Sequence, residues 1–406
     1  MIVFHIDVNN AYLSWEAVYR LNQSDESLDL RTIPSVVGGS EKSRHGIVLA
    51  KSMPARSFGI QTAETLVEAR RKCPGLVIVP PRHHLYKEFS TRLISYLKSL
   101  TPVVEQYSID EAFADMTDSP LLRDHSPVEA ADVIRREIHS RFGYTVNVGV
   151  STNKVLAKMA SDFEKPDKVH SLFPDEIESK MWPLPVSELF FVGHASAKKL
   201  YNLGIRTIGE LAQFDKNILC SHMGKHGALI HDYANGIDKS PVLSQQTEAK
   251  GYGNSTTLPR DITDSREAKK VLLKLCESVG GRLKADDILA QVVSVTIKDH
   301  LFHSVSHQRT LTSATCTTAE LYQCVCELFD ELWDGTPIRL LGVSATKLTR
   351  ERSHQINLLD SSFYMKQGKM EKAVGEIRKK FGDNAIFRAS SLEKKQDFND
   401  NIDRKE

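Results

Sequence analysis

The chain has 406 residues, 41% of them hydrophobic, and a formal net charge of +1. That length supports several domain-sized cores, and the near-neutral charge means that any contact with nucleic acid must come from local patches. No apolar run is long enough to cross a bilayer and no signal-peptide pattern follows Met1, so we expect neither a membrane protein nor an exported one.

The first predicted element is a strand over residues 1–10. This segment is apolar, is rich in β-branched and aromatic residues, and ends at Asp7 and polar turn formers. It predicts a buried strand with Asp7 at its end, followed by a helix from Ala11 onward. Taken alone, Asp7 suits the cap of that helix equally well, and Tyr12 suits an ordinary core aromatic.

The most informative segment is 107–113, in which Asp110 and Glu111 lie between two short runs typical of a β-hairpin. Neighbouring side chains on a regular strand point to opposite faces, so adjacent carboxylates converge only at a strand end or turn. If the first strand pairs beside the hairpin, Asp7, Asp110 and Glu111 form an open site of oxygen ligands. Such a site suits Mg²⁺ ions that carry a triphosphate and activate an attacking hydroxyl. Without the third carboxylate, an acidic pair is commonly a solvated turn.

The next strong pattern predicts a strand over 144–150 and a helix over 153–163. The apolar residues of the second segment recur at helical spacing, and Ser151 or Thr152 is the expected N-cap. Lys165 follows this helix, so we expect it near the cleft that contains the carboxylates.

A helix-hairpin-helix pattern follows over residues 191–211, with glycines and apolar residues at the corresponding spacing. Such a turn exposes backbone N–H groups, here at Gly193 and His194, which bind phosphate regardless of base sequence. Ala195 stands where a second glycine is usual, so a purely structural helical hairpin remains the alternative.

Beyond a polar stretch over 235–250, which predicts a linker, strand and helix patterns alternate. The predicted elements are a helix over 271–283, strands over 290–297 and 304–312, a helix over 320–333 and a strand over 339–348. This order is typical of an α+β sheet covered by helices. The six cysteines are scattered without zinc spacing, so we expect reduced thiols in a cytoplasmic protein.

Four separated segments together resemble the Y family of DNA polymerases, closest to the DinB-like or DNA polymerase IV branch of translesion enzymes. They are His5-Ile6-Asp7 with Tyr12 following, residues 54–60, residues 107–115, and residues 149–158 running on to Lys165-Pro166. Their order and spacing match the family across about the first 240 residues.

The resemblance implies an α+β, multidomain fold, arranged as a right-hand polymerase with a palm, fingers, a helical thumb and an α+β little finger. The implied domains are 1–10 and 74–165 for the palm, 11–73 for the fingers, 166–234 for the thumb with its helix-hairpin-helix, 235–250 for a linker, 251–352 for the little finger and 353–406 for a clamp-binding, partly flexible tail.

The resemblance also implies a set of catalytic residues. In such enzymes Asp7, Asp110 and Glu111 are the metal carboxylates and the backbone carbonyl of Val8 adds an oxygen ligand, which implies two Mg²⁺ ions. Tyr12 falls where the family places an aromatic steric gate, whose ring leaves no room for a ribose 2′-hydroxyl. The gate would select deoxynucleotides.

Nucleotide contacts are implied at Arg56 and Lys165, whose positions meet the incoming triphosphate in the family. A solvated surface cation is the alternative for each. The chain departs from the family at Met53, where many members have a tyrosine that hydrogen-bonds the phosphates, and at Ala50, where some have a threonine. Neutral hydrogen bonds are worth about 0.5–1.5 kcal/mol net, so we expect weaker nucleotide binding without loss of chemistry.

DNA and clamp contacts are expected in the last third of the chain. In the little finger, four cations are expected to line the template backbone, although solvated strand ends explain any one of them. These cations are Lys298, Arg309, Lys347 and Arg350. Segment 355–359 resembles the glutamine-plus-aliphatic peptides that dock bacterial polymerases onto the sliding clamp, with Gln355, Leu358 and Leu359 as anchors. A packed C-terminal strand is the alternative for this segment.

The combined interpretation is a template-directed DNA polymerase of low processivity that adds deoxynucleotides to a primer 3′ end and copies past damaged bases. Its implied partners are primer-template DNA, deoxynucleoside triphosphates and the sliding clamp, and we expect a cytoplasmic monomer. The alternatives are another two-metal palm enzyme, such as a nucleotide cyclase, and a catalytically silent DNA-binding or clamp-adaptor protein. Tyr12 and the helix-hairpin-helix count against the first, and the three carboxylates count against the second.

Overall fold

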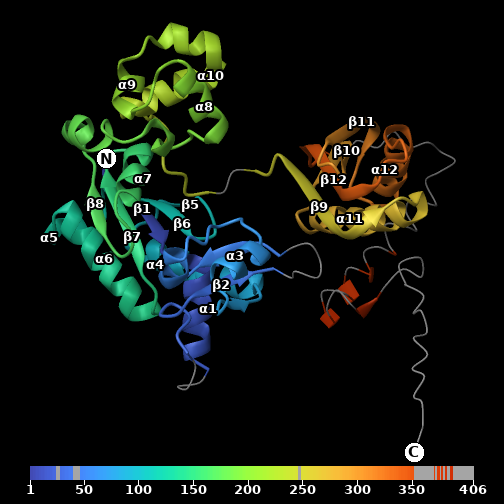
Figure 1. Ribbon diagram of the computed structural model, residues 1–406, viewed down its shortest axis with the longest axis horizontal. Helices are drawn as coiled ribbons and strands as arrows, with labels where there is room; N and C mark the ends of the chain where they lie inside the picture. Colours follow the sequence, from blue (N-terminus) through green and yellow to red (C-terminus); the bar gives the residue numbers. More distant parts are fainter. Residues whose placement is uncertain are drawn as a thin grey trace, which may run out of the picture. The chain divides into compact units, whose positions relative to one another are not determined.

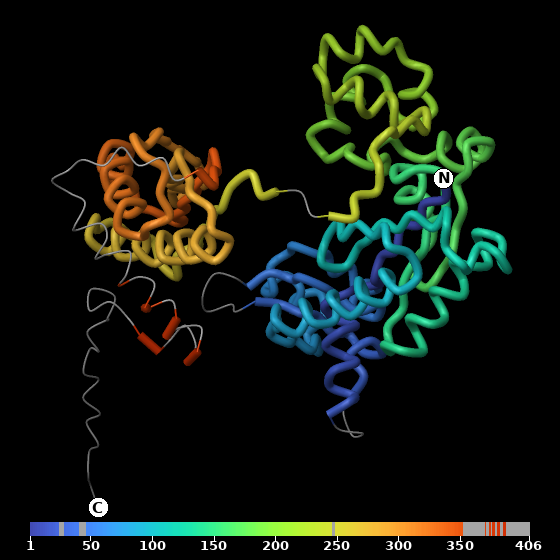
Figure 2. Tube along the Cα trace, turned by 180° about the vertical axis from the view of Figure 1, so that it is seen from behind, coloured from blue at the N-terminus to red at the C-terminus, as the bar shows by residue number. Residues whose placement is uncertain are grey.

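The computed structural model describes residues 1–23, 28–39, 46–245 and 248–351, together with residues 370, 373, 374, 376, 377, 380, 381, 385 and 386. The described residues form two compact units, one up to residue 245 and one from residue 248 on. Figure 1 labels the helices and strands, and Figure 2 follows the chain from behind. Among the described residues, no helix is both long and apolar enough to span a membrane.

A five-stranded sheet forms the centre of the first unit, with its strands in the order β5-β6-β1-β7-β8. The strands are β1 (Val3–Val8), β5 (Val104–Gln106), β6 (Glu111–Asp115), β7 (Val146–Ser151) and β8 (Val169–Ser171). Strand β1 pairs antiparallel with both β6 and β7, so it is the middle strand and all of its residues are buried. That position accounts for its nearly continuous apolar sequence.

Helices cover both faces of this sheet, as Figure 1 shows. The helices packed on one face are α1 (Ala11–Leu21), α4 (His83–Leu100) and α6 (Pro127–Phe142). The short helix α5 (Leu121–Asp124) precedes α6. Helix α7 (Lys154–Asp162) packs on the other face. Because side chains alternate along a strand, His5 and Asp7 point to the α7 face. Glu111 lies opposite Asp7 in the β1–β6 register and therefore shares that face.

Helix α7 approaches the sheet closely at Gly149 of β7. A Cβ at this position would lie 1.9 Å from the carbonyl oxygen of Ala157, so the approach requires glycine. The close packing brings Lys158 and Ser161 of α7 into contact with side chains of β1 and β6.

A smaller three-stranded sheet in the order β3-β2-β4 also belongs to the first unit. Its elements are β2 (Ser35–Gly38), β3 (Val48–Lys51), α2 (Met53–Ser57), α3 (Leu66–Lys72) and β4 (Val77–Val79). A separate small core, which includes Val36, Ile60 and Leu66, lies beneath this sheet. Ser52 caps α2 by accepting a hydrogen bond from the Ala55 amide at 3.0 Å, and so fixes how the helix leaves β3.

Residues 174–234 form a helical cluster. Its elements are the short turns η2 (Pro174–Glu176), η3 (Ile177–Met181) and η4 (Val186–Glu188), followed by α8 (His194–Asn202), α9 (Ile208–Gln213) and α10 (Lys216–Ala234). Helices α8 and α9 pack through Leu200, Ile208 and Leu211, which are residues whose spacing predicted the helix-hairpin-helix. Thr207 and Glu210 form a capping box at the start of α9.

The second unit contains a four-stranded antiparallel sheet in the order β11-β10-β12-β9. Its elements are β9 (Gly251–Ile262), α11 (Ser265–Ala285), β10 (Leu289–Asp299), β11 (Ser304–Thr315), α12 (Thr318–Leu332) and β12 (Ile338–Thr349). Both helices pack on one face of the sheet and enclose the core. The other face carries small hydroxyl side chains, including Ser294 and Ser344, whose Oγ atoms lie 2.7 Å apart.

The structure corrects several details of the predicted elements. The N-cap of α7 is Asn153 rather than the predicted Ser151 or Thr152. The Asn153 side chain accepts a hydrogen bond from the Leu156 amide at 2.9 Å, whereas Ser151 is still part of β7. Strand β9 was not predicted, since most of its side chains are exposed or half-buried and give no apolar signal.

Packing also crosses three of the predicted domain boundaries. Helix α1 contributes to the core of the five-stranded sheet, although the fingers were predicted to begin at residue 11. Strand β4 pairs with β2, so the smaller sheet extends beyond residue 73. Strand β8 pairs with β7, so the central sheet extends beyond residue 165.

Candidate active site

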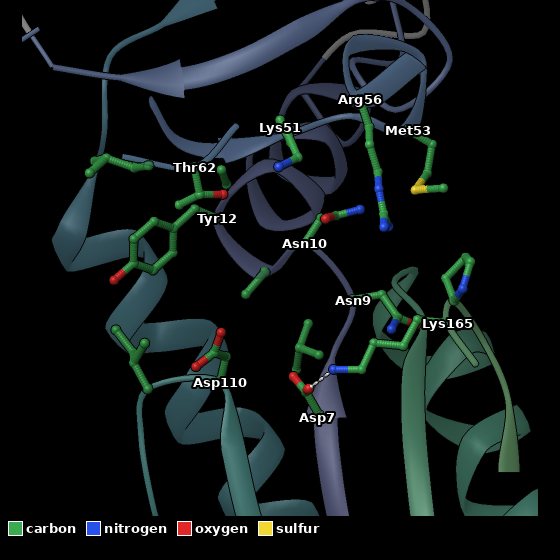
Figure 3. A pocket seen from close by; sticks show the side chains of 16 residues that line it. Asp7, Asn9, Asn10, Tyr12, Lys51, Met53, Arg56, Thr62, Asp110 and Lys165 are labelled. Carbon is green, nitrogen blue, oxygen red and sulfur yellow. Dashed lines mark hydrogen bonds and ion pairs between the residues drawn. The ribbon is translucent and has the colours of Figure 1, made fainter. Parts of the chain in front are cut away.

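A cavity of about 410 Å³ lies at the end of β1. It is lined by Asp7, Val8, Asn9, Asn10, Ala11, Tyr12, Leu49, Ala50, Lys51, Met53, Arg56, Thr62, Ile109, Asp110, Lys165 and Pro166. Figure 3 shows these side chains. Each of the four segments that carry the family resemblance contributes to this lining, so the fold brings them together at one site.

Asp7 faces this cavity from the end of the buried middle strand. Its carboxylate is bonded to the ammonium of Lys165, which also contacts Asp162 Oδ1 at 2.8 Å. Burial raises the pKa of Asp7, and the charge of Lys165 opposes that shift. Burial disfavours the ammonium as well, but Asp7 and Asp162 raise the pKa of Lys165. In this structure Lys165 therefore contacts Asp7, whereas the sequence predicted that it contacts a triphosphate. Asp7 does not cap α1.

Asp110 lies in the turn between β5 and β6, where Ser108 holds it. The Ser108 hydroxyl donates to Asp110 Oδ1 at 2.6 Å and accepts from the amides of Asp110 and Glu111 at 3.2 and 3.0 Å. The Val8 amide donates to the Asp110 carbonyl oxygen at 3.1 Å. Asp110 and Asp7 therefore border the same cavity from adjacent strands, as Figure 3 shows. Ser108 was missed in the sequence, although a serine two residues before an aspartate is a common turn signal.

Glu111 lies beside the cavity rather than in its lining. The Lys158 ammonium donates to Glu111 Oε1 at 3.1 Å, and His5 Nε2 lies 3.7 Å from Oε2. Burial opposes the negative charge, but His5 and Lys158 lower the pKa of Glu111 to about 2. His5 is fully buried, which lowers its own pKa, and its Nδ1 lies 2.7 Å from Ser161 Oγ. The structure thus places two of the predicted carboxylates at the cavity and the third directly behind it.

The donor chemistry of this site fits a hard metal cation. Within the described ranges, no three histidine, cysteine, aspartate or glutamate side chains lie close enough to hold a metal ion as they stand. In this structure Lys165 contacts Asp7 and Lys158 contacts Glu111. Asp7, Val8 and Asp110 nevertheless line one cavity, and Mg²⁺ prefers carboxylate and carbonyl oxygen ligands such as these residues contain. The raised pKa of Asp7 indicates a carboxylate that gains from further positive charge.

Tyr12 lines the cavity from α1 and is supported from behind by a second aromatic ring. It stacks on Tyr86 with ring centroids 4.5 Å apart and planes 15° apart. The Tyr86 hydroxyl donates to Glu16 Oε1 at 2.9 Å, and Arg82 binds both carboxylate oxygens of the fully buried Glu16. This buried network fixes the plane on which Tyr12 rests, so its ring is a rigid part of the cavity wall.

The wall formed by β3 and α2 contains the remaining predicted nucleotide contacts. Arg56 and Met53 both line the cavity, and Figure 3 shows the guanidinium of Arg56 directed into it. Ala50 and Met53 have no hydrogen-bond donors in their side chains. Lys51 at the end of β3 and Thr62, which follows α2, were both missed in the sequence, because local patterns do not show which residues face the cavity.

Asn9 was also missed, and it ties the end of β1 to the segment that contains Lys165. Its Nδ2 donates to Asn147 Oδ1 at 3.1 Å, and its Oδ1 accepts from the Asp167 amide at 2.9 Å. These partners are far from Asn9 in the sequence, so no local pattern could have indicated the contact.

The predicted phosphate-binding turn lies outside this cavity. Gly193 is the N-cap of α8 and His194 is its first residue, and both are exposed. Gly193 has no side chain that could accept from the first amides of the helix, and no side-chain cap is present there. The turn thus has the exposed backbone that the prediction requires.

The second unit separates the four predicted cations into two groups. Lys347 and Arg350 are exposed, and Lys298 is half-buried near the end of β10. The Arg350 guanidinium lies 3.8 Å from Glu248, and both side chains are largely exposed. These three cations can therefore meet an external anion.

Arg309 differs from those three, because it lies on the helix-covered side of the sheet. It is opposite Val293 in the β10–β11 register, and Val293 is fully buried in the core. The Arg309 guanidinium contacts Glu327 and Glu331 of α12 at 2.5 Å each. We therefore leave Arg309 out of the candidate DNA surface. The predicted clamp anchors Gln355, Leu358 and Leu359 lie outside the described residues.

Comparisons with known proteins agree on one family. Its model, the impB/mucB/samB family, matches residues 6–162; the C-terminal domain of that family matches residues 249–358, and the IMS family HHH motif matches residues 174–205. The chain is 46% identical over 395 residues to DNA polymerase IV of Clostridium acetobutylicum, covering 97% of this chain and 99% of the relative. It is 34% identical over 398 residues to DNA polymerase IV 1 of Bacillus subtilis, covering 97% and 94%.

The fold has a counterpart among solved structures. A Y-family DNA polymerase chimera, Dbh-Dpo4(243-245)-Dbh, aligns with a TM-score of 0.74 and 24% identity, covering 86% of this chain and 100% of the chimera. The predicted α+β, multidomain fold with a helix-hairpin-helix is thereby confirmed.

Proposed function

The chain belongs to the Y family of DNA polymerases, in the DNA polymerase IV branch, and from this membership we propose that it is a DNA-directed DNA polymerase. It would extend a primer 3′ end opposite a template, with low processivity, and past damaged bases during DNA repair. The observation that supports this most directly is the single cavity bordered by Asp7 and Asp110 on one side and Arg56 on the other. Carboxylates that hold metal and cations that hold phosphate are what phosphoryl transfer requires.

The carboxylates would bind two Mg²⁺ ions, with Asp7, Asp110, Glu111 and the Val8 carbonyl as ligands. When bound, these ions supply activation of the primer hydroxyl and stabilisation of the leaving pyrophosphate. Ser108 keeps Asp110 turned toward the cavity before substrate arrives.

Lys165 would exchange partners during the reaction. It is bonded to Asp7 and also lines the cavity, so its long side chain can turn to a triphosphate once Asp7 has another cation. Arg56 would bind phosphate oxygens with its guanidinium fork. Tyr12 would lie beneath the sugar and exclude a ribose 2′-hydroxyl, with Tyr86 preventing the ring from moving away.

Each part of the fold then has a proposed role. The five-stranded sheet with its helices would be the palm, the smaller sheet the fingers, residues 174–234 the thumb, and the second unit the little finger. Gly193 and His194 would bind the duplex backbone through exposed amides. Lys298, Lys347 and Arg350 would bind template phosphates without reading sequence.

We further propose a cytoplasmic monomer that docks on the sliding clamp through Gln355, Leu358 and Leu359. Docking would raise the effective concentration of the enzyme at the primer end. Truncation before Gln355 should leave basal synthesis unchanged and abolish stimulation by the clamp. Equal stimulation of the truncated and full chains would remove the docking role.

The decisive experiment is extension of a labelled primer-template with Mg²⁺ and four deoxynucleotides, comparing the full chain with Asp110→Ala. We expect template-matched extension by the full chain and none by the variant, while both bind DNA equally. A matched control is Asp124→Ala, which removes an exposed carboxylate of α5 and should extend normally. Tight DNA binding without extension by the unmodified chain would favour the silent adaptor instead.

A further inference from the structure

Lys51 enters the active-site cavity from a rigid base. It is the last residue of β3, and the next residue, Ser52, is buried and hydrogen-bonded on both sides. The Ser52 hydroxyl donates to the Ile33 carbonyl at 2.7 Å and accepts from the Ala55 amide at 3.0 Å. These bonds fix the backbone at Lys51, and Figure 3 shows that it extends from the same wall as Arg56. Its side chain is half-buried.

The charged side chains that act on the Lys51 ammonium are Arg56, Glu64 and Lys72. No ion pair of Lys51 occurs within the described ranges, and the nearby Glu64 is already bound by Lys72 at 2.5 Å. Burial lowers the pKa of Lys51, the positive charge of Arg56 lowers it further, and the negative charge of Glu64 opposes these shifts. A partly desolvated ammonium beside a second cation is stabilised by an anion placed between them. The local electrostatics therefore favour a bound anion at this wall.

Few other groups on this wall can bind an anion. The β3 and α2 residues that line the cavity are Leu49, Ala50, Lys51, Met53 and Arg56. Among these, only Lys51 and Arg56 have side-chain donors. Thr62, which follows α2, adds a neutral hydroxyl to the lining, so Lys51 and Arg56 are the cations that an anion would meet on this wall.

We propose that Lys51, together with Arg56, binds a phosphate group of the incoming nucleoside triphosphate and replaces the neutral donors that Ala50 and Met53 cannot supply. The inference rests on the proposed polymerase function. A hydrogen bond from a charged donor is about twice as strong as a neutral one, so one ammonium compensates for the two missing groups. Lysine presents its three donors as a point charge and needs no fork geometry.

The test is Lys51→Met, which keeps the length of the side chain and removes its charge. We expect the KM for each of the four deoxynucleotides to rise by about tenfold, with kcat changed by less than about twofold. Nucleotide affinity measured on a complex with a dideoxy-terminated primer, where no bond can form, should fall by the same factor. DNA affinity and the thermal midpoint should match those of the parent chain. Lys51→Arg should recover most of the nucleotide affinity.

Two further variants separate a phosphate contact from a general loss of charge. Arg71→Met removes an exposed cation of helix α3 that does not line the cavity, so its KM should equal the parent value. Met53→Tyr restores a neutral donor on the wall. It should lower the KM more in the Lys51→Met background than in the parent, because in the parent the phosphate is already bound by Lys51.

The outcomes distinguish this inference from the function beneath it. If the parent chain extends primers and Lys51→Met keeps the parent KM and affinity, the phosphate contact is wrong and the polymerase function stands. A rise in KM confined to one deoxynucleotide would also overturn the inference, since all four share the same triphosphate. If the parent chain itself fails to extend a primer, the proposed function falls and this inference falls with it.

Discussion

Two regions of the molecule are built from antiparallel strands. One is the part of the five-stranded sheet that carries Asp7 and Glu111, and the other is the face of the second unit's sheet that carries no helices. They differ in how their charged side chains are held. At the first, Asp7 and Glu111 are mostly buried and each is bound to a lysine. At the second, no ion pair of Lys298 or Lys347 occurs among the described residues. Buried charges depend on every neighbour, whereas exposed ones act nearly independently and are screened by salt. Single substitutions should therefore have large effects in the first region and small, additive ones in the second.

The largest effect is expected for Asp7→Asn. The variant removes an anionic oxygen from the cavity and leaves Lys165 with only Asp162, so the rate of single-turnover primer extension should fall by about 10³-fold. DNA affinity, measured by fluorescence anisotropy, should not change. Asp162→Asn is the matched control, because Asp162 contacts the same lysine without lining the cavity. If both variants lost activity equally, the activity would depend on the ion pairs of Lys165 rather than on the position of Asp7 in the cavity.

The next effect concerns choice of sugar rather than rate. Tyr12→Ala should lower discrimination between deoxy- and ribonucleotides by about 100-fold, because the ring beneath the sugar is lost while the carboxylates are intact. The ratio of kcat/KM for the two nucleotides measures it.

Tyr86→Phe is the control for Tyr12→Ala. It keeps the ring on which Tyr12 stacks but removes the hydroxyl bonded to Glu16, so it should reduce stability and leave sugar discrimination nearly unchanged. Unchanged discrimination in Tyr12→Ala would make Tyr12 an ordinary core aromatic.

A smaller effect is expected for Ser108→Ala. Three hydrogen bonds that shape the turn around Asp110 would be lost, so kcat should fall by about tenfold while DNA affinity is retained. Ser108→Thr keeps the hydroxyl and should recover much of the rate. Equal rates for Ser108→Ala and the parent would mean that strand pairing alone positions Asp110.

The structural features that were predicted correctly from the sequence are those that a few neighbouring residues specify. The apolar run of β1, the turn that carries Asp110 and the periodicity of α7 are each specified within a few residues, and each was found where it was expected. The resemblance supplied the rest, since it joined separated segments into one cavity. The sequence placed Lys165 near the carboxylates, but neither source revealed its direct contact with Asp7, because that contact joins residues 158 positions apart.

The sequence was least informative where the feature to be predicted depends on which side chains are exposed to solvent. Strand β9 was missed because its side chains are largely exposed and its sequence shows no apolar alternation. The four cations of the second unit looked equivalent, yet Arg309 faces the helices and is bound by two glutamates. Lys51 was overlooked because facing the cavity depends on how β3 leads into α2, which is a property of the fold.

The smallest effects should separate Lys298 from Arg309 on the sheet of the second unit. Lys298→Ala should weaken binding of primer-template DNA by about threefold at low salt. It should also reduce the slope of log affinity against log salt concentration by about one, which corresponds to one fewer released ion. Arg309→Ala removes a charge of the same sign from the adjacent strand, but its guanidinium is already bound by Glu327 and Glu331. Its salt dependence should therefore match the parent.

Affinity measured over a series of salt concentrations tests this pair, because the slope counts released ions and is insensitive to a small loss of stability. A reduced slope for Arg309→Ala would mean that DNA displaces the two glutamates, and the exclusion of Arg309 from the DNA surface would then be wrong. Lys298 follows the buried Ile297 on β10 and so lies on the face of the sheet that carries no helices. If only Lys298→Ala reduces the slope, DNA binds that face. The side on which a strand residue lies would then determine its role more strongly than its charge.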